Sequence, residues 1–406
     1  MVMMPTISMS DAEEQNHPQQ IQNHNYEKQQ QKQLKNHANA SAYPPADSFS
    51  EEQQQHHDHR RIVLLPGPHK TSSTSVQFNM CKWIQKRKKK NKNDHLNVTN
   101  DRNAVVTGGL QKYWTIPIPD QVFKLCKLKC TKIFAPLAHD LLVSNDPHQR
   151  FEKCGGEDII PLFRDEFHKQ WNNGRSLVIA SEHLDWIANE DRNAGNQLLE
   201  NLLHILPAES TSTITAVVVY RAPRLDHLIS LWHQHGMLQK LSFYDFLMTV
   251  APVQDWLRVL DSLLLAERFI KRGINTVLID LSGVQKHGYD ISLVIACDVL
   301  GADCDKEKHF VGEKAEKPVI RNVKDHSNAK VNVTEAQLDA IDKLIESYDC
   351  NFHHILMNDK LQVLYPNELE RIMNLCSQNA TYQQNEYPKS HDQLMKKIIE
   401  ILTNKK

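Results

Sequence analysis

Four short runs of apolar, mostly β-branched residues are the feature that most constrains how this chain can fold. They span Arg61–Leu65, Ser176–Ala180, Ile214–Tyr220 and Thr276–Asp280. Their apolar residues are continuous rather than alternating, which is typical of strands that are buried on both faces of a parallel sheet. Turn-forming residues bound these runs, because Pro-Gly-Pro follows the first and Arg-Ala-Pro follows the third.

Helical patterns fill the stretches between and after these runs. Amphipathic helices are predicted at Asp158–Trp171, Asn196–Leu206, Val253–Arg272, Thr334–Ser347, Pro366–Cys376 and Ser390–Thr403. The fourth of these opens with the capping box Thr334-x-x-Gln337. Strands that alternate with helices predict right-handed βαβ units. The sequence therefore predicts a three-layer α/β fold, with a central parallel sheet flanked by helices.

Composition divides the chain into two parts. Residues 1–60 are rich in Gln, His, Asn and Ser and lack apolar periodicity, so we expect a disordered tail. Residues 61–406 are long enough for one large core, and they predict a single α/β domain. Within it, the Asn- and Lys-rich stretch 86–112 predicts a loop inserted after the first helix.

Charge and hydropathy argue against two classes of partner. The chain has 48 Lys and Arg against 49 Asp and Glu, so its overall field does not favour nucleic acid. We interpret the basic run 86–90 as a solvated loop, with a polyanion contact or a nuclear signal as alternatives. No apolar run is long enough for a transmembrane helix, and the N-terminus lacks the pattern of a signal peptide. We therefore expect no membrane span.

The eight cysteines are scattered and show no zinc-ligand spacing. We expect them to be reduced residues of the core, and we expect no metal site. Asn97, Asn332 and Asn379 lie in N-glycosylation sequons, which matter only if the protein is lumenal.

The segment that follows the first run has the composition of a phosphate site. Over residues 65–77 it reads Leu-Pro-Gly-Pro-His-Lys-Thr-Ser-Ser-Thr-Ser-Val-Gln. A parallel strand ends at the edge of the sheet where such folds bind ligands, and a helix start offers free N–H groups to an anion. Lys70 adds a charge, but Gly67 lies only three residues before it, so the Walker A spacing does not fit. A hydroxyl-rich helix start without a ligand is the alternative interpretation.

Residues 67–77 resemble the GPHKTGTTSxQ loop of sulfotransferases, particularly of their bacterial-type and carbohydrate-directed branch. In that family the loop grips the 5′-phosphosulfate end of 3′-phosphoadenosine 5′-phosphosulfate (PAPS). The resemblance implies a P-loop NTPase-like sulfotransferase fold, with PAPS as the co-substrate and no metal.

A second segment, Val217–Trp232, resembles the element of the same family that binds the 3′-phosphate, a strand that ends in Arg-x-Pro with a helical Ser beyond it. Arg221 and Ser230 match its pattern, and Arg224 is an alternative to Arg221. Together the two resemblances imply that PAPS is bound by Gly67, His69, Lys70, Thr71, Ser72, Ser73, Thr74, Arg221 and Ser230.

The run that ends in Ser181-Glu182 resembles a third element of the family. Sulfuryl transfer needs a base to accept the proton of the acceptor and a cation beside the leaving phosphate. We predict Glu182 as that base, His183 as the reserve base and Lys70 as the cation. His69 is a weaker candidate base. A Ser-Glu pair that merely caps the next helix is the structural alternative.

The leading hypothesis is therefore a PAPS-dependent sulfotransferase that acts on a hydroxyl or an amine. One alternative is a small-molecule kinase, with Asp280 as the Mg²⁺ ligand at a strand end. Another is a non-catalytic binding protein with the same fold. It is suggested by Ser72, which replaces the usual glycine of the loop, and by an Arg221–Ser230 spacing one residue longer than usual. Because the family has cytosolic and Golgi-lumenal branches, we expect a cytoplasmic protein and keep the Golgi lumen as the alternative.

Overall fold

The computed structural model divides the chain into two units, Met1–His59 and Arg60–Lys406. The structure describes residues 60–67, 73–84, 110, 113–126, 132, 134–142, 154, 157–188, 194–207, 211–221, 224–235, 240–250, 261–302, 304, 334–378 and 388–403. The expected tail up to residue 59, the basic run 86–90 and all of the expected insertion 86–112 except Leu110 lie outside the described residues.

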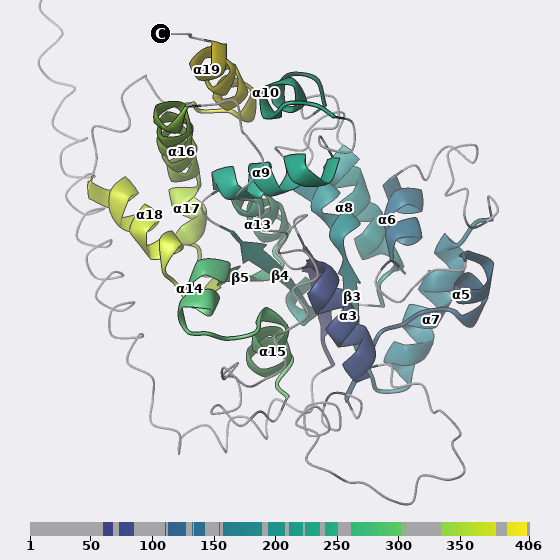
Figure 1. Ribbon diagram of the computed structural model, residues 1–406. Coiled ribbons are helices and arrows are strands. Elements are labelled where there is room, and N and C mark those ends of the chain that lie inside the picture. The colour runs from purple at the N-terminus through teal and green to yellow at the C-terminus, as the bar shows by residue number, and fades with distance from the viewer. Residues whose placement is uncertain are drawn as a thin grey trace, which may run out of the picture. The chain divides into compact units, whose positions relative to one another are not determined.

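Six parallel strands form a single sheet in the order β2-β3-β1-β4-β5-β6 (Figure 1). The strands are β1 (Ile62–Pro66), β2 (Trp114–Thr115), β3 (Ser176–Ser181), β4 (Ile214–Tyr220), β5 (Asn275–Asp280) and β6 (Leu361–Leu364). The four predicted runs form the four inner strands, and every residue of β1 is buried, as expected for a sheet covered on both faces. The sequence did not predict the edge strands β2 and β6, because runs of two and four residues are too short to stand out.

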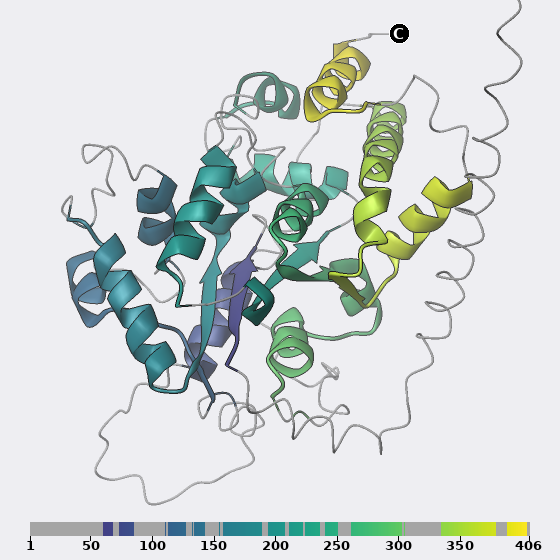
Figure 2. The ribbon, with the colours of Figure 1, turned by 180° about the vertical axis from the view of Figure 1, so that it is seen from behind.

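Helices on both faces of this sheet complete the three layers. Helices α3 and α15 lie on one face, whereas α7 and α13 lie on the other (Figures 1 and 2). The longer helices are α3 (Ser73–Ile84), α5 (Asp120–Cys126), α6 (Ala135–Leu142), α7 (Ile160–Asn172), α8 (Ala194–Ile205), α9 (Arg224–His235), α13 (Ser262–Lys271), α16 (Glu335–Asp349), α18 (Glu368–Gln378) and α19 (His391–Thr403). The shorter helical elements are η6 (Glu182–Ala188), η8 (Thr211–Thr213), α10 (Phe243–Asp245), η10 (Phe246–Val250), α14 (Leu281–Lys286), α15 (Ile291–Val294), η11 (Ile295–Val299), η14 (Cys350–Phe352) and α17 (His353–Leu356). The predicted three-layer α/β fold class is confirmed.

Capping side chains decide where two of the predicted helices begin. The capping box of α16 is confirmed, since Thr334 N donates to Gln337 Oε1 at 3.0 Å and Gln337 N donates to Thr334 Oγ1 at 3.3 Å. The prediction of one continuous helix over Val253–Arg272 was wrong, because residue 261 is not helical. Asp261 is extended and accepts hydrogen bonds from the N–H groups of Leu263 and Leu264, so α13 begins only at Ser262. Residues 253–260 lie outside the described residues.

The expectation of reduced cysteines was also wrong. Disulfides join Cys126 to Cys154, Cys297 to Cys304, and Cys350 to Cys376, and Cys81 is disulfide-bonded as well. Two of the three pairs link residues 28 and 26 positions apart, which meet only when separate elements pack together. Spacing along the chain could not reveal these pairs.

Within the described ranges, the longest and most apolar helices still fall short of what a membrane crossing requires.

Candidate functional site

The strand order creates a crevice between the carboxyl ends of β1 and β4. These strands are neighbours, but the chain leaves β1 toward β2 and β3 and leaves β4 toward β5, on the opposite side. Such a reversal is where open α/β sheets bind ligands. The β1–β4 ladder pairs only Ile62–Leu64 with Ile214–Ala216. Pro66 has no N–H group with which to extend it.

A small pocket lies where the two strands stop pairing. It is lined by Leu65, Pro66, Gly67, Val76, Gln77, Val217, Val219 and Ile295. These residues come from the end of β1, the inner side of α3, β4 and the π-helical turn η11. No feature of the sequence marks Ile295, because it lies more than 200 residues from Gly67 along the chain.

Helix α3 starts beside this pocket. It begins at Ser73, has 12 residues and carries no acidic residue in its first turn, so its positive end is not neutralised by its own side chains. Gly67 is half-buried at the end of β1. The predicted site residues His69, Lys70, Thr71 and Ser72 lie outside the described residues. Ser73 and Thr74 are the first two residues of α3, and their side chains are also outside the description.

The structure brings together Arg221 and Ser230, the two residues that were predicted to bind the 3′-phosphate. Arg221 directly follows β4 and is half-buried, and its Nη2 donates to Ser230 Oγ in α9 at 3.2 Å. The one-residue difference in spacing therefore does not separate the guanidinium from the hydroxyl. Arg224 is the first residue of α9, and its side chain lies outside the description, so its role as an alternative stays a prediction.

The predicted bases lie on the other side of β1. Strand β3 ends at the buried Ser181, which is paired in register with Pro66, and Glu182 opens the 3₁₀ helix η6. Glu182 and His183 are both half-buried. His183 N donates to Ser181 Oγ at 3.2 Å, and its ring packs edge-on against Trp186 with ring centroids 5.1 Å apart. Ser181 therefore caps this turn, and Glu182 is held at the carboxyl edge of the sheet.

Glu182 and Arg221 lie on opposite sides of the end of β1. They follow β3 and β4, which are separated by β1. With neighbouring strands about 4.8 Å apart, and with Arg221 further along the strand direction, their Cα atoms are separated by at least about 10 Å. A ligand that contacts both residues must therefore span at least this distance.

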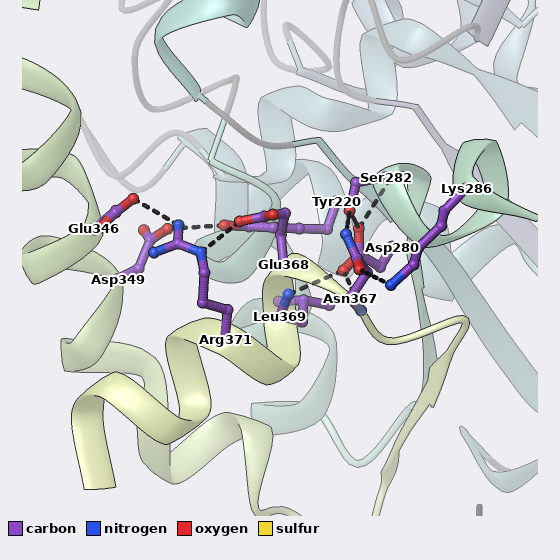
Figure 3. Close-up of polar contacts among 10 residues, drawn as sticks. All are labelled: Tyr220, Asp280, Ser282, Lys286, Glu346, Asp349, Asn367, Glu368, Leu369 and Arg371. Carbon is purple, nitrogen blue, oxygen red and sulfur yellow. Dashed lines mark hydrogen bonds and ion pairs between the residues drawn. The ribbon is translucent and has the colours of Figure 1, made fainter. Parts of the chain in front are cut away.

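Asp280 lies at the end of β5 and is fully buried. Figure 3 shows how its oxygens are engaged. Its Oδ1 accepts from Ser282 N at 3.0 Å and from Ser282 Oγ at 2.6 Å, while its Oδ2 accepts from the backbone N–H groups of Asn367 at 3.0 Å and Leu369 at 2.9 Å. Asp280 therefore caps α14 and holds the start of α18 against the sheet. All of its strong acceptor positions are used internally.

A second polar network joins β4 to α16 and α16 to α18 (Figure 3). Tyr220 and Asp349 are both buried, and the Tyr220 hydroxyl donates to Asp349 Oδ2 at 3.1 Å. On the outer side, Arg371 bonds Glu346 at 2.6 Å and Glu368 at 2.7 Å. The hydrogen bond to Glu346 raises the pKa of Arg371 above its ordinary value, and the bond to Glu368 raises it further. These contacts fix helices rather than open toward the crevice.

In the part of the chain that the structure describes, no three or more His, Cys, Asp or Glu residues gather in a way that could hold a metal ion. Comparison of the chain with models of known protein families, with curated proteins and with solved structures gave no match.

Proposed function

We propose that this chain is a sulfotransferase that moves a sulfuryl group from PAPS to a hydroxyl or an amine. The observation that carries the proposal is the Arg221–Ser230 pair, which lies just after β4, the strand next to β1. A guanidinium and a hydroxyl that converge at the ligand-binding edge of a parallel sheet suit a phosphate group. The resemblance of residues 67–77 to the sulfotransferase loop supports the second half of the same site.

The two ends of the crevice suit the two anionic ends of PAPS. Arg221 and Ser230 would bind the 3′-phosphate through charge-assisted hydrogen bonds. Gly67 and the segment that leads into Ser73 and Thr74 would bind the 5′-phosphosulfate with backbone N–H groups and hydroxyls. In sequence, Lys70 lies midway between Gly67 and Ser73, which suits a cation that serves this end of the ligand.

The proposed transfer needs one base and one cluster of positive charge. The acceptor oxygen or nitrogen attacks sulfur, and the bond between sulfur and the bridging phosphate oxygen breaks. The acceptor proton passes to the Glu182 carboxylate, with His183 as the reserve base. The electron pair of the broken bond leaves with adenosine 3′,5′-bisphosphate, whose new charge is stabilised by Lys70 and the positive end of α3.

The kinase alternative is weakened by the surroundings of Asp280. A Mg²⁺ ligand at this position would need an oxygen that is accessible from the crevice. Instead, Asp280 Oδ1 accepts two hydrogen bonds from Ser282 of α14, and Oδ2 accepts two from the backbone at the start of α18.

Thermal stabilisation by a ligand tests the proposal and separates it from both alternatives. We expect adenosine 3′,5′-bisphosphate at about 100 times its Kd to stabilise the fold by about 2.7 kcal/mol, with a matching rise in Tm. Lys70→Ala and Arg221→Ala should abolish or reduce the rise, whereas Arg164→Ala on the exposed side of α7 should not. A rise with ATP–Mg²⁺ alone would favour the kinase. No rise with either ligand in a folded protein would refute the enzymatic proposal and favour the binding protein.

A further inference from the structure

Disulfides tie together several separate elements of the domain. Cys126 at the end of α5 is joined to Cys154, Cys297 in η11 to Cys304, and Cys350 in η14 to Cys376 in α18. Cys81 of α3 is disulfide-bonded too. Thus each of the seven described cysteines is paired.

Burial alone does not explain these cysteines. A buried reduced cysteine packs as a small apolar residue and needs no second cysteine beside it. Cys297, Cys304, Cys350 and Cys376 are only half-buried, so as thiols they would be exposed to oxidants and metals. The disulfides Cys297–Cys304 and Cys350–Cys376 leave no free thiol at these positions. They also link residues that are 7 and 26 positions apart.

We infer that this chain matures and acts in an oxidising compartment, such as the secretory lumen, the periplasm or the cell exterior. Thiol reductants keep cysteines reduced in the cytosol, so a domain whose elements are joined by several disulfides belongs where such bonds persist. This inference replaces the cytoplasmic expectation drawn from the sequence. A further step rests on the proposed function: the molecule that carries the acceptor hydroxyl or amine must be present in the same compartment.

One of the cross-links bears directly on the crevice. The turn η11 carries Ile295, which lines the pocket, and Asp298, which accepts a hydrogen bond from the Tyr365 hydroxyl at 2.6 Å. Cys297 lies between these two residues and ties the turn to Cys304. The disulfide therefore holds one wall of the pocket in place.

Mapping of the thiols tests the pairing without any ligand. The full chain, made in an exporting host, is denatured at low pH, alkylated without reductant, digested and analysed by mass spectrometry. We expect linked peptides for 126–154, 297–304 and 350–376. The single variant Cys350→Ser should gain one alkylated thiol at Cys376, and the double variant C350S/C376S should gain none. Alkylated cysteines at these positions in the folded wild-type protein would overturn the inference.

Protease protection tests the compartment itself. Intact vesicles and medium from the source cells are treated with protease, with and without detergent, and the chain is detected with an antibody. We expect it in the medium, or protected in vesicles until detergent is added. If the chain is digested without detergent, as a cytosolic marker is, the inferred compartment is wrong even if the thiols pair in vitro.

Hydrogen exchange tests the role of the η11 cross-link, with a second disulfide as the matched control. In C297S/C304S we expect at least about tenfold faster amide exchange in η11, because a 7-residue loop has been released. In C350S/C376S the faster exchange should appear in α18 instead, with a fall in Tm on the order of 5 °C. Unchanged exchange in η11 would refute the positioning role. None of these measurements uses a ligand. A failure of the disulfide inference can therefore be distinguished from a failure of the sulfotransferase proposal.

Discussion

Two strand-end acids on the same edge of the sheet differ in their burial and surroundings. At the end of β5, Asp280 is fully buried and accepts four hydrogen bonds, two from Ser282 of α14 and two from Asn367 and Leu369 at the start of α18. At the end of β3, Glu182 is half-buried and lies across β1 from the Arg221–Ser230 pair. A buried carboxylate is stable only when its oxygens are satisfied, and a satisfied carboxylate has no oxygen left to act as base or ligand. Position at a strand end therefore does not assign a role: Asp280 caps α14 and the start of α18, whereas a catalytic role for Glu182 stays a proposal.

The largest effect should come from Glu182. Glu182→Gln keeps the size of the side chain but removes the base, so we expect kcat for sulfuryl transfer to fall by about 10²–10⁴. The affinity for adenosine 3′,5′-bisphosphate, measured by calorimetry, should stay within about twofold. Glu157→Gln, at an exposed position before α7, is the control. Full activity of Glu182→Gln would move the role of the base to His183.

Asp280 should affect stability where Glu182 affects rate. Asp280→Ala leaves the N–H groups of Ser282, Asn367 and Leu369 without their acceptor, which should destabilise the fold by about 3 kcal/mol. Urea denaturation measures this loss. Asp339→Ala removes an exposed ion pair of α16 and should cost less than about 0.5 kcal/mol. If Asp280→Ala instead kept its stability and lost activity, the contrast between the two regions would be broken.

A smaller loss of stability is expected from Tyr220→Phe. This change leaves the ring in the core but removes the buried hydroxyl that donates to Asp349. The free energy of unfolding should fall by about 1–2 kcal/mol, because the buried Asp349 Oδ2 loses the hydrogen bond from Tyr220. Tyr244→Phe, at a half-buried position of α10, serves as the control. A loss no greater than the control would show that the β4–α16 contact contributes little.

The smallest expected effect is a loss of folding stability at low pH that depends on His353. Burial, with a further contribution from His354, lowers the pKa of His353 below its usual value of 6.5. The unfolded chain therefore binds this proton more readily than the folded chain, so stability is complete above about pH 6.5 and falls as the pH drops below it. His353→Gln should flatten this decline in chemical denaturation at several pH values. His204→Gln, on the exposed side of α8, should leave the decline unchanged.

Local chemistry explains which parts of the fold could be predicted. The inner strands form from continuous apolar runs, and the capping box of α16 contains both of its partners within four residues. The edge strands β2 and β6 are too short to give a pattern, and the start of α13 depends on one aspartate inside an otherwise helical stretch. For the site, Arg221 and Ser230 were predicted and are in contact, whereas Ile295 was missed because nothing in its own neighbourhood marks it.

The sequence alone determined the class of the fold and the strand ends that carry polar groups, because apolar periodicity and turn residues act over a few positions. Only the tertiary structure decided the strand order, the crevice between β1 and β4, the internal use of Asp280 and the disulfide pairs. Each of these depends on residues that are far apart in the chain and meet only after packing. Contacts between distant residues leave no local pattern, so they cannot be inferred from neighbouring residues alone.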